Sequence, residues 1–128
     1  MPAIPIEDVL FYDAETRSAI DLRKVGSWRY CRSPTTDVFM VCYAVGDDEV
    51  QTWFPGEPVP PAITEHARRG GYFSAHNTGF EYPLTKLILA PRYGWPDVPI
   101  SQMHDTAAEC AAMALPGALE DAGQVLGL

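Results

Sequence analysis

Five short apolar runs are the sequence feature that most constrains what this chain can fold into. They predict strands over residues 8–13, 38–45, 50–54, 72–75 and 100–103. The short break Gly46-Asp47-Asp48 makes the second and third strands an antiparallel pair. Helical patterns separate or follow the later runs, over residues 62–69, 78–89, 107–114 and 118–126. A hairpin series followed by alternating strands and helices predicts an α/β fold, a mixed five-stranded sheet flanked by helices.

Length and composition indicate one globular domain over residues 1–128. Hydrophobic residues make up 47% of the chain and charged residues 20%, which is typical of a packed domain and not of a disordered one. No apolar run approaches the roughly 20 residues of a membrane span. The stretch Met1–Asp8 lacks the features of a secretory signal, so we expect a cytoplasmic protein without membrane contact. A net charge of −8 argues against a domain that mainly grips duplex DNA, but not against a nuclease that holds a few nucleotides through metal ions.

The first chemical motif is Asp13-Ala14-Glu15, at the end of the first apolar run. Residues two apart in a strand point to the same face, so both carboxylates can approach one ion. Magnesium prefers such hard oxygen ligands. Alone, an Asp-x-Glu motif more often lies on a solvated turn.

The second motif is His76-Asn77-Thr78-Gly79-Phe80-Glu81, directly after the fourth apolar run. It places the Glu81 carboxylate one turn into a helix, near its electropositive start. Each residue also has an ordinary structural role, with Asn77 as a turn or cap and Phe80 in the core.

Together the two motifs resemble the DnaQ-like (DEDD) 3′–5′ exonuclease superfamily. Its first motif is Asp-x-Glu, and its second is an Asn followed four residues later by an acid, which here is Glu81 in place of the more usual Asp. With the stretches 13–18, 26–30, 104–106 and 115–120, the chain looks most similar to the exonuclease domain of bacteriophage-type family A DNA polymerases. The resemblance covers nearly the whole chain.

This resemblance implies a ribonuclease-H-like fold and a proofreading-type exonuclease. Such a domain hydrolyses 3′-terminal phosphodiesters of single-stranded or frayed DNA with two Mg²⁺ or Mn²⁺ ions. Asp13 would bridge both ions, Glu15 would bind the ion on the nucleophile side, and Glu81 would hold the second ion through water. The terminal nucleotide would contact Thr16, His76, Asn77 and Phe80. The expected partners are a 3′ DNA end and a polymerase domain in the same or a separate chain, in a bacterial or phage-infected cell.

One part of the superfamily pattern is absent from this sequence. The superfamily has a fourth carboxylate, an Asp preceded by Tyr or His on a late helix, and no such motif follows Glu81. Asp105 is the nearest acid but matches a segment before that motif. We therefore expect a domain truncated at its C-terminal end, without its last helix or helices and with its fourth carboxylate beyond Leu128. The isolated chain would then be weakly active or inactive.

Two other functions fit the same sequence. One is a catalytically incomplete exonuclease fold that binds nucleic acid or a partner protein. The other is a ribonuclease-H-like nuclease that acts on RNA, which would recognise the 2′-hydroxyl. A serine or thiol enzyme is disfavoured, because the sequence contains no Gly-x-Ser-x-Gly and neither Cys31 nor Cys110 has a histidine nearby in sequence.

Overall fold

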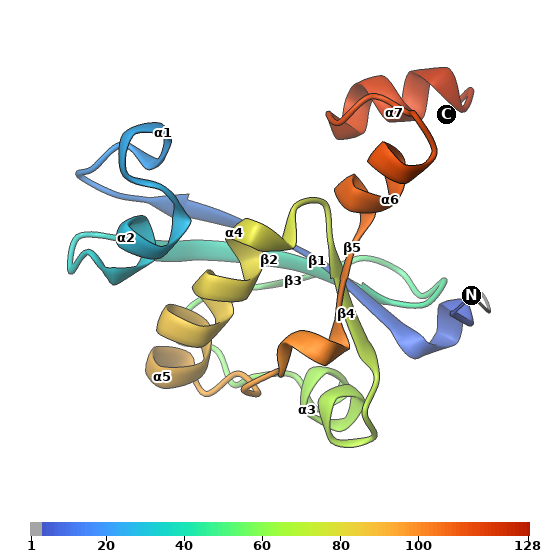
Figure 1. The fold of residues 1–128 in the computed structure, drawn as a ribbon. Helices are drawn as coiled ribbons and strands as arrows, with labels where there is room; N and C mark the ends of the chain where they lie inside the picture. The colour runs from blue at the N-terminus through green and yellow to red at the C-terminus, as the bar shows by residue number, and fades with distance from the viewer. Residues whose placement is uncertain (1–3) are drawn as a thin grey trace.

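Strand β1 (Val9–Arg17) runs through the centre of a five-stranded sheet in the computed structural model, which describes residues 4–128 (Figure 1). The strand order is β3-β2-β1-β4-β5. On one side lie β2 (Asp37–Val45) and β3 (Gln51–Trp53), each antiparallel to its neighbour. On the other side lie β4 (Tyr72–Ala75) and β5 (Met103–Asp105), both parallel to β1. The mixed five-stranded sheet is confirmed, and it is consistent with a ribonuclease-H-like fold.

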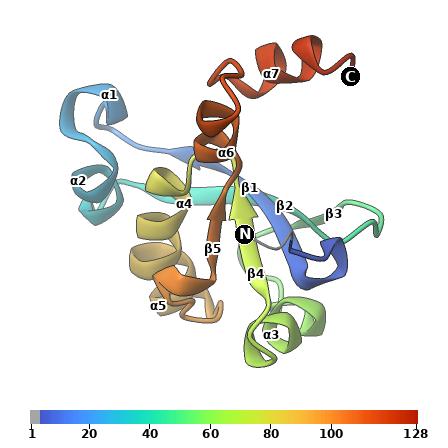
Figure 2. The same ribbon diagram turned by 45° about the vertical axis from the view of Figure 1, so that its right-hand side comes forward.

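Helices flank this sheet, also as predicted. In chain order they are α1 (Leu22–Val25), α2 (Ser27–Arg32), α3 (Pro61–Arg68), α4 (Thr78–Leu84), the π-helical segment η2 (Thr85–Leu89), α5 (Ala90–Tyr93), α6 (Thr106–Ala112) and α7 (Leu119–Val125). Short 3₁₀ turns, η1 (Ile6–Asp8) and η3 (Ile100–Gln102), precede β1 and β5. In both views of the ribbon, α6 and α7 extend away from the sheet beyond the end of β5 (Figure 2). None of the described helices is long and apolar enough to cross a bilayer.

The core lies on one face of β1. From Leu10 onward the side chains alternate along the strand, with Leu10, Tyr12 and Ala14 buried and Phe11, Asp13 and Glu15 exposed. The continuous helix from α4 through α5 covers this face and contributes Leu84, Ile88 and Leu89, each fully buried. The Tyr12 hydroxyl lies 3.0 Å from the Thr85 hydroxyl, which fixes the helix against the centre of the sheet.

Strand β1 is longer than predicted. The sequence suggested a strand that ends at Asp13, but β2 pairs with β1 as far as Arg17, with a register shift between Glu15 and Thr16. The Asp-x-Glu motif therefore lies inside the strand and not at its end. The polar stretch that follows was not predicted to be helical, yet it forms α1 and α2, which pack Tyr30 and Cys31 into the core.

Two later boundaries also differ. The helix predicted over 78–89 continues to Tyr93, with Pro91 lying just after the π-helical segment η2. The last strand begins at Met103 and not at residue 100. Ile100 is 68% exposed on η3, so its apolar character misled the prediction.

Gly71 makes a tight contact that gives a testable prediction. A Cβ at this position would lie 2.4 Å from Nε2 of His66, whose buried ring also contacts the Tyr72 carbonyl at 2.8 Å. Gly71→Ala should therefore destabilise the fold by about 1–3 kcal/mol through overpacking. Gly117→Ala is the control, since that site is open. Equal urea midpoints for the two variants would contradict the prediction.

Candidate active site

The candidate residues lie toward the carboxyl ends of the parallel strands β1 and β4. His76 and Asn77 follow β4, whereas Asp13 and Glu15 lie within β1, which extends past β4. Strand β1 pairs with β4 only from Val9 to Phe11. Asp13 and Glu15 therefore lie on a part of β1 that has β2 on one side and no parallel strand on the other. In parallel sheets, ligands commonly bind just beyond the carboxyl ends of the strands.

Asp13 and Glu15 lie on the face of β1 opposite the core. Both are exposed. In the antiparallel pairing of β1 with β2, Asp13 lies opposite Cys42 and Glu15 opposite Met40. A groove of about 600 Å³ on this face is bordered by Phe11, Asp13 and His76. The Asp13 carboxylate is thus accessible to a ligand in the groove, and Glu15 lies on the same face of the strand, as the two-residue spacing predicted.

Glu81 differs from both because it is buried. Its side chain is 4% exposed, and its Oε2 has no hydrogen-bond partner within the described part of the chain. Burial, with smaller contributions from the nearby charges of Asp13 and Asp105, raises the pKa of Glu81 to about 8. The Glu81 carboxyl consequently holds a proton at neutral pH unless a positive charge comes within reach.

The carboxylates do not form a closed metal cage. Over residues 4–128, no three Asp, Glu, His or Cys side chains converge in an arrangement that could hold an ion. Asp13 and Glu81 are close enough for the charge of one to affect the pKa of the other. Glu15 lies two residues further along β1.

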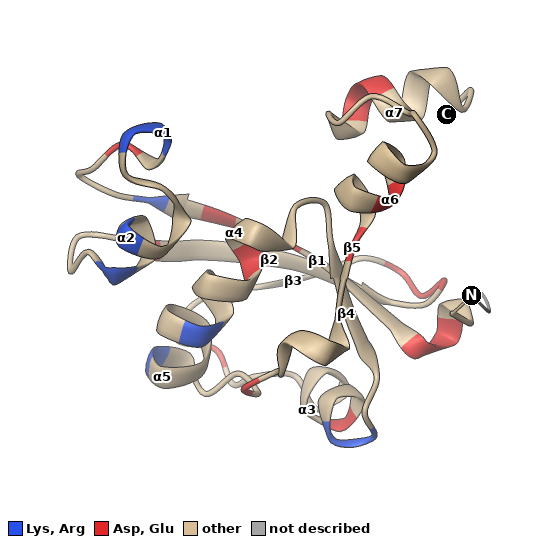
Figure 3. Ribbon diagram, viewed as in Figure 1, with Lys and Arg blue, Asp and Glu red and all other residues tan. Residues whose placement is uncertain are grey.

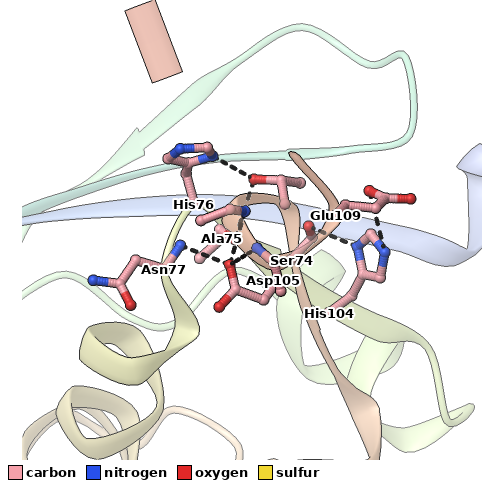
Figure 4. Close-up of polar contacts among 10 residues, drawn as sticks. Ser74, Ala75, His76, Asn77, His104, Asp105 and Glu109 are labelled. Atoms are coloured by element: carbon pink, nitrogen blue, oxygen red, sulfur yellow. Dashed lines mark hydrogen bonds and ion pairs between the residues drawn. The ribbon is translucent and has the colours of Figure 1, made fainter. Parts of the chain in front are cut away.

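Asp105 holds the junction between β4 and α4, a role that was not predicted (Figure 4). Its Oδ1 accepts hydrogen bonds from the backbone N–H groups of Asn77 at 3.0 Å and Ala107 at 2.9 Å. Its Oδ2 accepts from the N–H and the hydroxyl of Thr78, both at 3.2 Å. Burial alone would raise the pKa of Asp105, but the backbone N–H donors outweigh it and lower the pKa. Both oxygens are engaged, so Asp105 is poorly placed to act as a free metal ligand.

Asp105 also caps α6. An Asp before the run Thr106–Ala108 is an ordinary N-cap signal, and it could have been read as one. The hydrogen bond between Asp105 and Asn77 could not be predicted from local sequence, because the two residues are 28 positions apart in the chain. Asn77 itself adopts a left-handed conformation, with φ 95° and ψ 75°, which is uncommon for a residue other than glycine.

The remaining predicted contact residues lie around the same junction, and three of them touch other side chains. The His76 ring donates from Nε2 to the Gly117 carbonyl at 2.6 Å, and its Nδ1 lies 2.8 Å from the Thr106 hydroxyl. The Thr16 hydroxyl lies 2.9 Å from the hydroxyl of Tyr30, and the Phe80 ring lies 6.1 Å from the Tyr30 ring. The Asn77 side chain is exposed and makes no capping bond.

Asp105→Ala should destabilise the protein by about 2–4 kcal/mol, because it leaves several donors at the junction without their charged acceptor. Asp21→Ala is a matched control, since Asp21 caps α1 through a single bond to the Arg23 N–H. We expect the control to cost about 1 kcal/mol or less. Chemical denaturation would measure both, and equal losses would contradict the assigned role.

Comparison with known proteins gives one informative similarity. No protein-family profile matches the chain. The chain is 27% identical over 122 residues to a DNA polymerase of Bacillus phage SP02, a match that covers 93% of this chain. It spans only 18% of the length of that polymerase. The similarity is compatible with a polymerase-associated domain.

Proposed function

We propose that the chain forms the front part of a two-metal 3′–5′ exonuclease domain that serves a DNA polymerase. The observation that supports this most directly is the buried, unpartnered Glu81 carboxyl beside Asp13, at the edge where β1 extends past β4. A carboxyl group in this situation gains strongly from a cation nearby, because the cation removes both its desolvation penalty and the repulsion from Asp13. Similarity to a phage polymerase supports the polymerase context.

The residues fit magnesium or manganese in chemical type, since all three candidates are carboxylates. Asp13 would bridge two ions, Glu15 would bind the ion on the nucleophile side, and Glu81 would hold the second. When bound, the two ions supply a hydroxide nucleophile and stabilise the leaving 3′ oxygen. Glu81 must release its proton before it can act as a ligand, so binding is favoured as the pH rises toward and above its pKa.

The 3′-terminal nucleotide would occupy the groove beside Asp13. Asn77 has the freest side chain of the four predicted contact residues and would hydrogen-bond the nucleotide directly. His76 borders the groove, while Thr16 and Phe80 contact Tyr30 and would contribute by shaping the site. Phosphoryl transfer depends mainly on positioning and charge neutralisation, so these residues suffice without a covalent nucleophile.

The fourth carboxylate of the complete site would come from a polymerase segment outside these 128 residues. Asp105 is a poor substitute, because hydrogen bonds already engage both of its oxygens. The polymerase would then act in a phage-infected bacterial cell, as the phage relative suggests.

A second candidate is a catalytically incomplete module that keeps the fold and binds nucleic acid. The observation that favours it is the lack, across the described residues, of three acidic or metal-binding side chains that converge. In this case Asp13 and Glu81 would bind metal weakly and hydrolysis would be absent.

Incubation with 5′-labelled single-stranded DNA tests the proposed function. With Mn²⁺ we expect a ladder of products shortened one nucleotide at a time from the 3′ end, abolished by EDTA and by a 3′-terminal phosphorothioate. Internal cleavage would indicate a different nuclease. No shortening, even after fusion to the following segment of a related polymerase, would favour the binding module.

A further inference from the structure

Positive charge is concentrated in one short segment of this acidic chain. Residues 16–36 contain five of the nine Lys and Arg and one of the 17 Asp and Glu, which gives a local charge of +4 within a chain of −8. The five are Arg17, Arg23, Lys24, Arg29 and Arg32. Figure 3 shows them gathered at one end of the sheet, on α1, α2 and the end of β1. The acidic turns at η1 and between β2 and β3 lie at the other end.

These five charges are free of ion pairs in the described structure. Three of the other four basic residues have acidic partners, with Arg68 lying 3.1 Å from Glu65, Lys86 2.5 Å from Asp97 and Arg92 3.9 Å from Asp37. No carboxylate within residues 4–128 lies within 4.0 Å of the five side-chain cations. They remain available to an anionic partner.

An exposed aromatic group lies among these charges. Trp28 on α2 is 43% exposed, and its ring meets the Tyr82 ring of α4 edge to face at 6.0 Å. The Arg32 guanidinium lies 5.8 Å from the Trp28 ring centre. A large indole held by a neighbouring ring and close to a cation offers a flat surface to another aromatic ring.

This surface adjoins the candidate active site. Helix α2 packs on α4, where Tyr82 directly follows Glu81. Tyr30 of α2 contacts both Thr16 at the end of β1 and Phe80 at the start of α4. A chain lying across α2 would therefore approach Glu15 and Glu81.

We propose that α1, α2 and Tyr82 form a binding surface for single-stranded polynucleotide, on which Trp28 stacks with a base and Arg29 and Arg32 contact phosphates. Unpaired bases present their faces for stacking, whereas bases within a duplex do not. Phosphates supply the negative charge that this surface complements. The inference deepens the proposed function by assigning where the strand lies upstream of its 3′ end, but binding at this surface does not depend on hydrolysis.

Tryptophan fluorescence tests the proposal directly. The other two tryptophans, Trp53 and Trp95, are 1% and 3% exposed, so quenching by oligothymidylate would report mainly on Trp28. The titration is made in EDTA, where no cleavage occurs. We expect quenching of the wild type, loss of the quenching in Trp28→Phe, and stronger binding of the single strand than of a duplex of the same length.

Variants followed by anisotropy of labelled oligothymidylate separate stacking from charge. Trp28→Ala should weaken binding about 5- to 100-fold, and Trp28→Phe should restore most of the loss. Arg29→Ala should reduce the slope of log affinity against log salt by about 0.7, as expected for one lost phosphate contact. Arg68→Ala is the matched control, on the exposed surface of α3, and should leave affinity and slope unchanged.

Unchanged affinity in Trp28→Ala, equal effects of Arg29→Ala and Arg68→Ala, or equal binding of duplex and single strand would each overturn the proposal. Capture of an acidic protein with no oligonucleotide binding would also overturn it. A chain that binds as expected but never shortens DNA would leave this surface assigned and remove only the exonuclease. A chain that shortens DNA equally well with and without Trp28 would support the exonuclease and remove this binding surface.

Discussion

Asp13→Asn should reduce the rate of 3′-nucleotide release at least about 100-fold while the protein remains folded. The substitution keeps the size of the side chain but removes the charge that would bridge both metal ions, and such charge neutralisation dominates phosphoryl transfer. The initial rate of shortening of 5′-labelled DNA with Mn²⁺ measures the effect. Asp47→Asn, in the exposed turn between β2 and β3, is the matched control and should retain the wild-type rate.

A second measurement on the same variant separates loss of chemistry from loss of structure. The charge of Asp13 contributes to the raised pKa of Glu81, so Asp13→Asn should lower that pKa and make the protein slightly more stable near pH 8. A variant that is both inactive and less stable than the wild type would have lost activity through unfolding. A variant that cleaves at the wild-type rate would exclude Asp13 from the site.

Glu81→Gln should stabilise the protein at high pH, by an amount on the order of a few kcal/mol above pH 8. The folded protein binds the Glu81 proton with a pKa of about 8, against 4.5 for the ordinary group. Between these two values the unfolded chain holds fewer protons than the folded chain, so wild-type stability falls as the pH rises. Glutamine has no proton to lose, and the difference between variant and wild type should grow from pH 5 to pH 9. Thermal unfolding across this range measures it.

Divalent metal should stabilise the wild type more than Glu81→Gln, the reverse of their order without metal. At pH 8 Mn²⁺ should raise the unfolding temperature of the wild type, because the ion binds the ionised carboxylate of the folded state only. Glu81→Gln should show a much smaller increase. Glu65→Gln, an exposed carboxylate on α3, is the control and should respond to pH and Mn²⁺ like the wild type. A Glu81→Gln difference that does not change with pH would mean that the carboxyl is not held in the neutral form.

Local pattern was sufficient to predict the sheet. The short apolar runs and the turn at Gly46 each depend on neighbouring residues, and the structure confirms the five strands and the antiparallel pair that they predicted. Helices α1 and α2 escaped prediction, since each has only four to six residues and packs few apolar side chains. Such short helices are stabilised by tertiary contacts, which periodicity cannot reveal.

The candidate site shows the same limit. Spacing along a strand was enough to expect Asp13 and Glu15 on one face, whereas Glu81 was singled out by the resemblance of its motif to the exonuclease superfamily. The burial of Glu81 depends on how α4 packs on β1, and the role of Asp105 depends on contact between β4 and β5. Neither is encoded in a local pattern. Of the acids after Glu81, sequence alone could not distinguish one that fixes the backbone from one free to bind a ligand.

The bonds from Asp105 to the start of α4 also determine when the site can form. Asn77 is held in its left-handed conformation by a residue that enters the sheet only with the last strand, 28 positions later. Strand β5 has three residues at the sheet edge, the kind of element that opens most readily in a native protein. Each such opening would release the β4–α4 turn and loosen the position of Glu81 while the core on the other side of β1 stays folded. The lifetime of the assembled site therefore depends on how often the edge of the sheet opens.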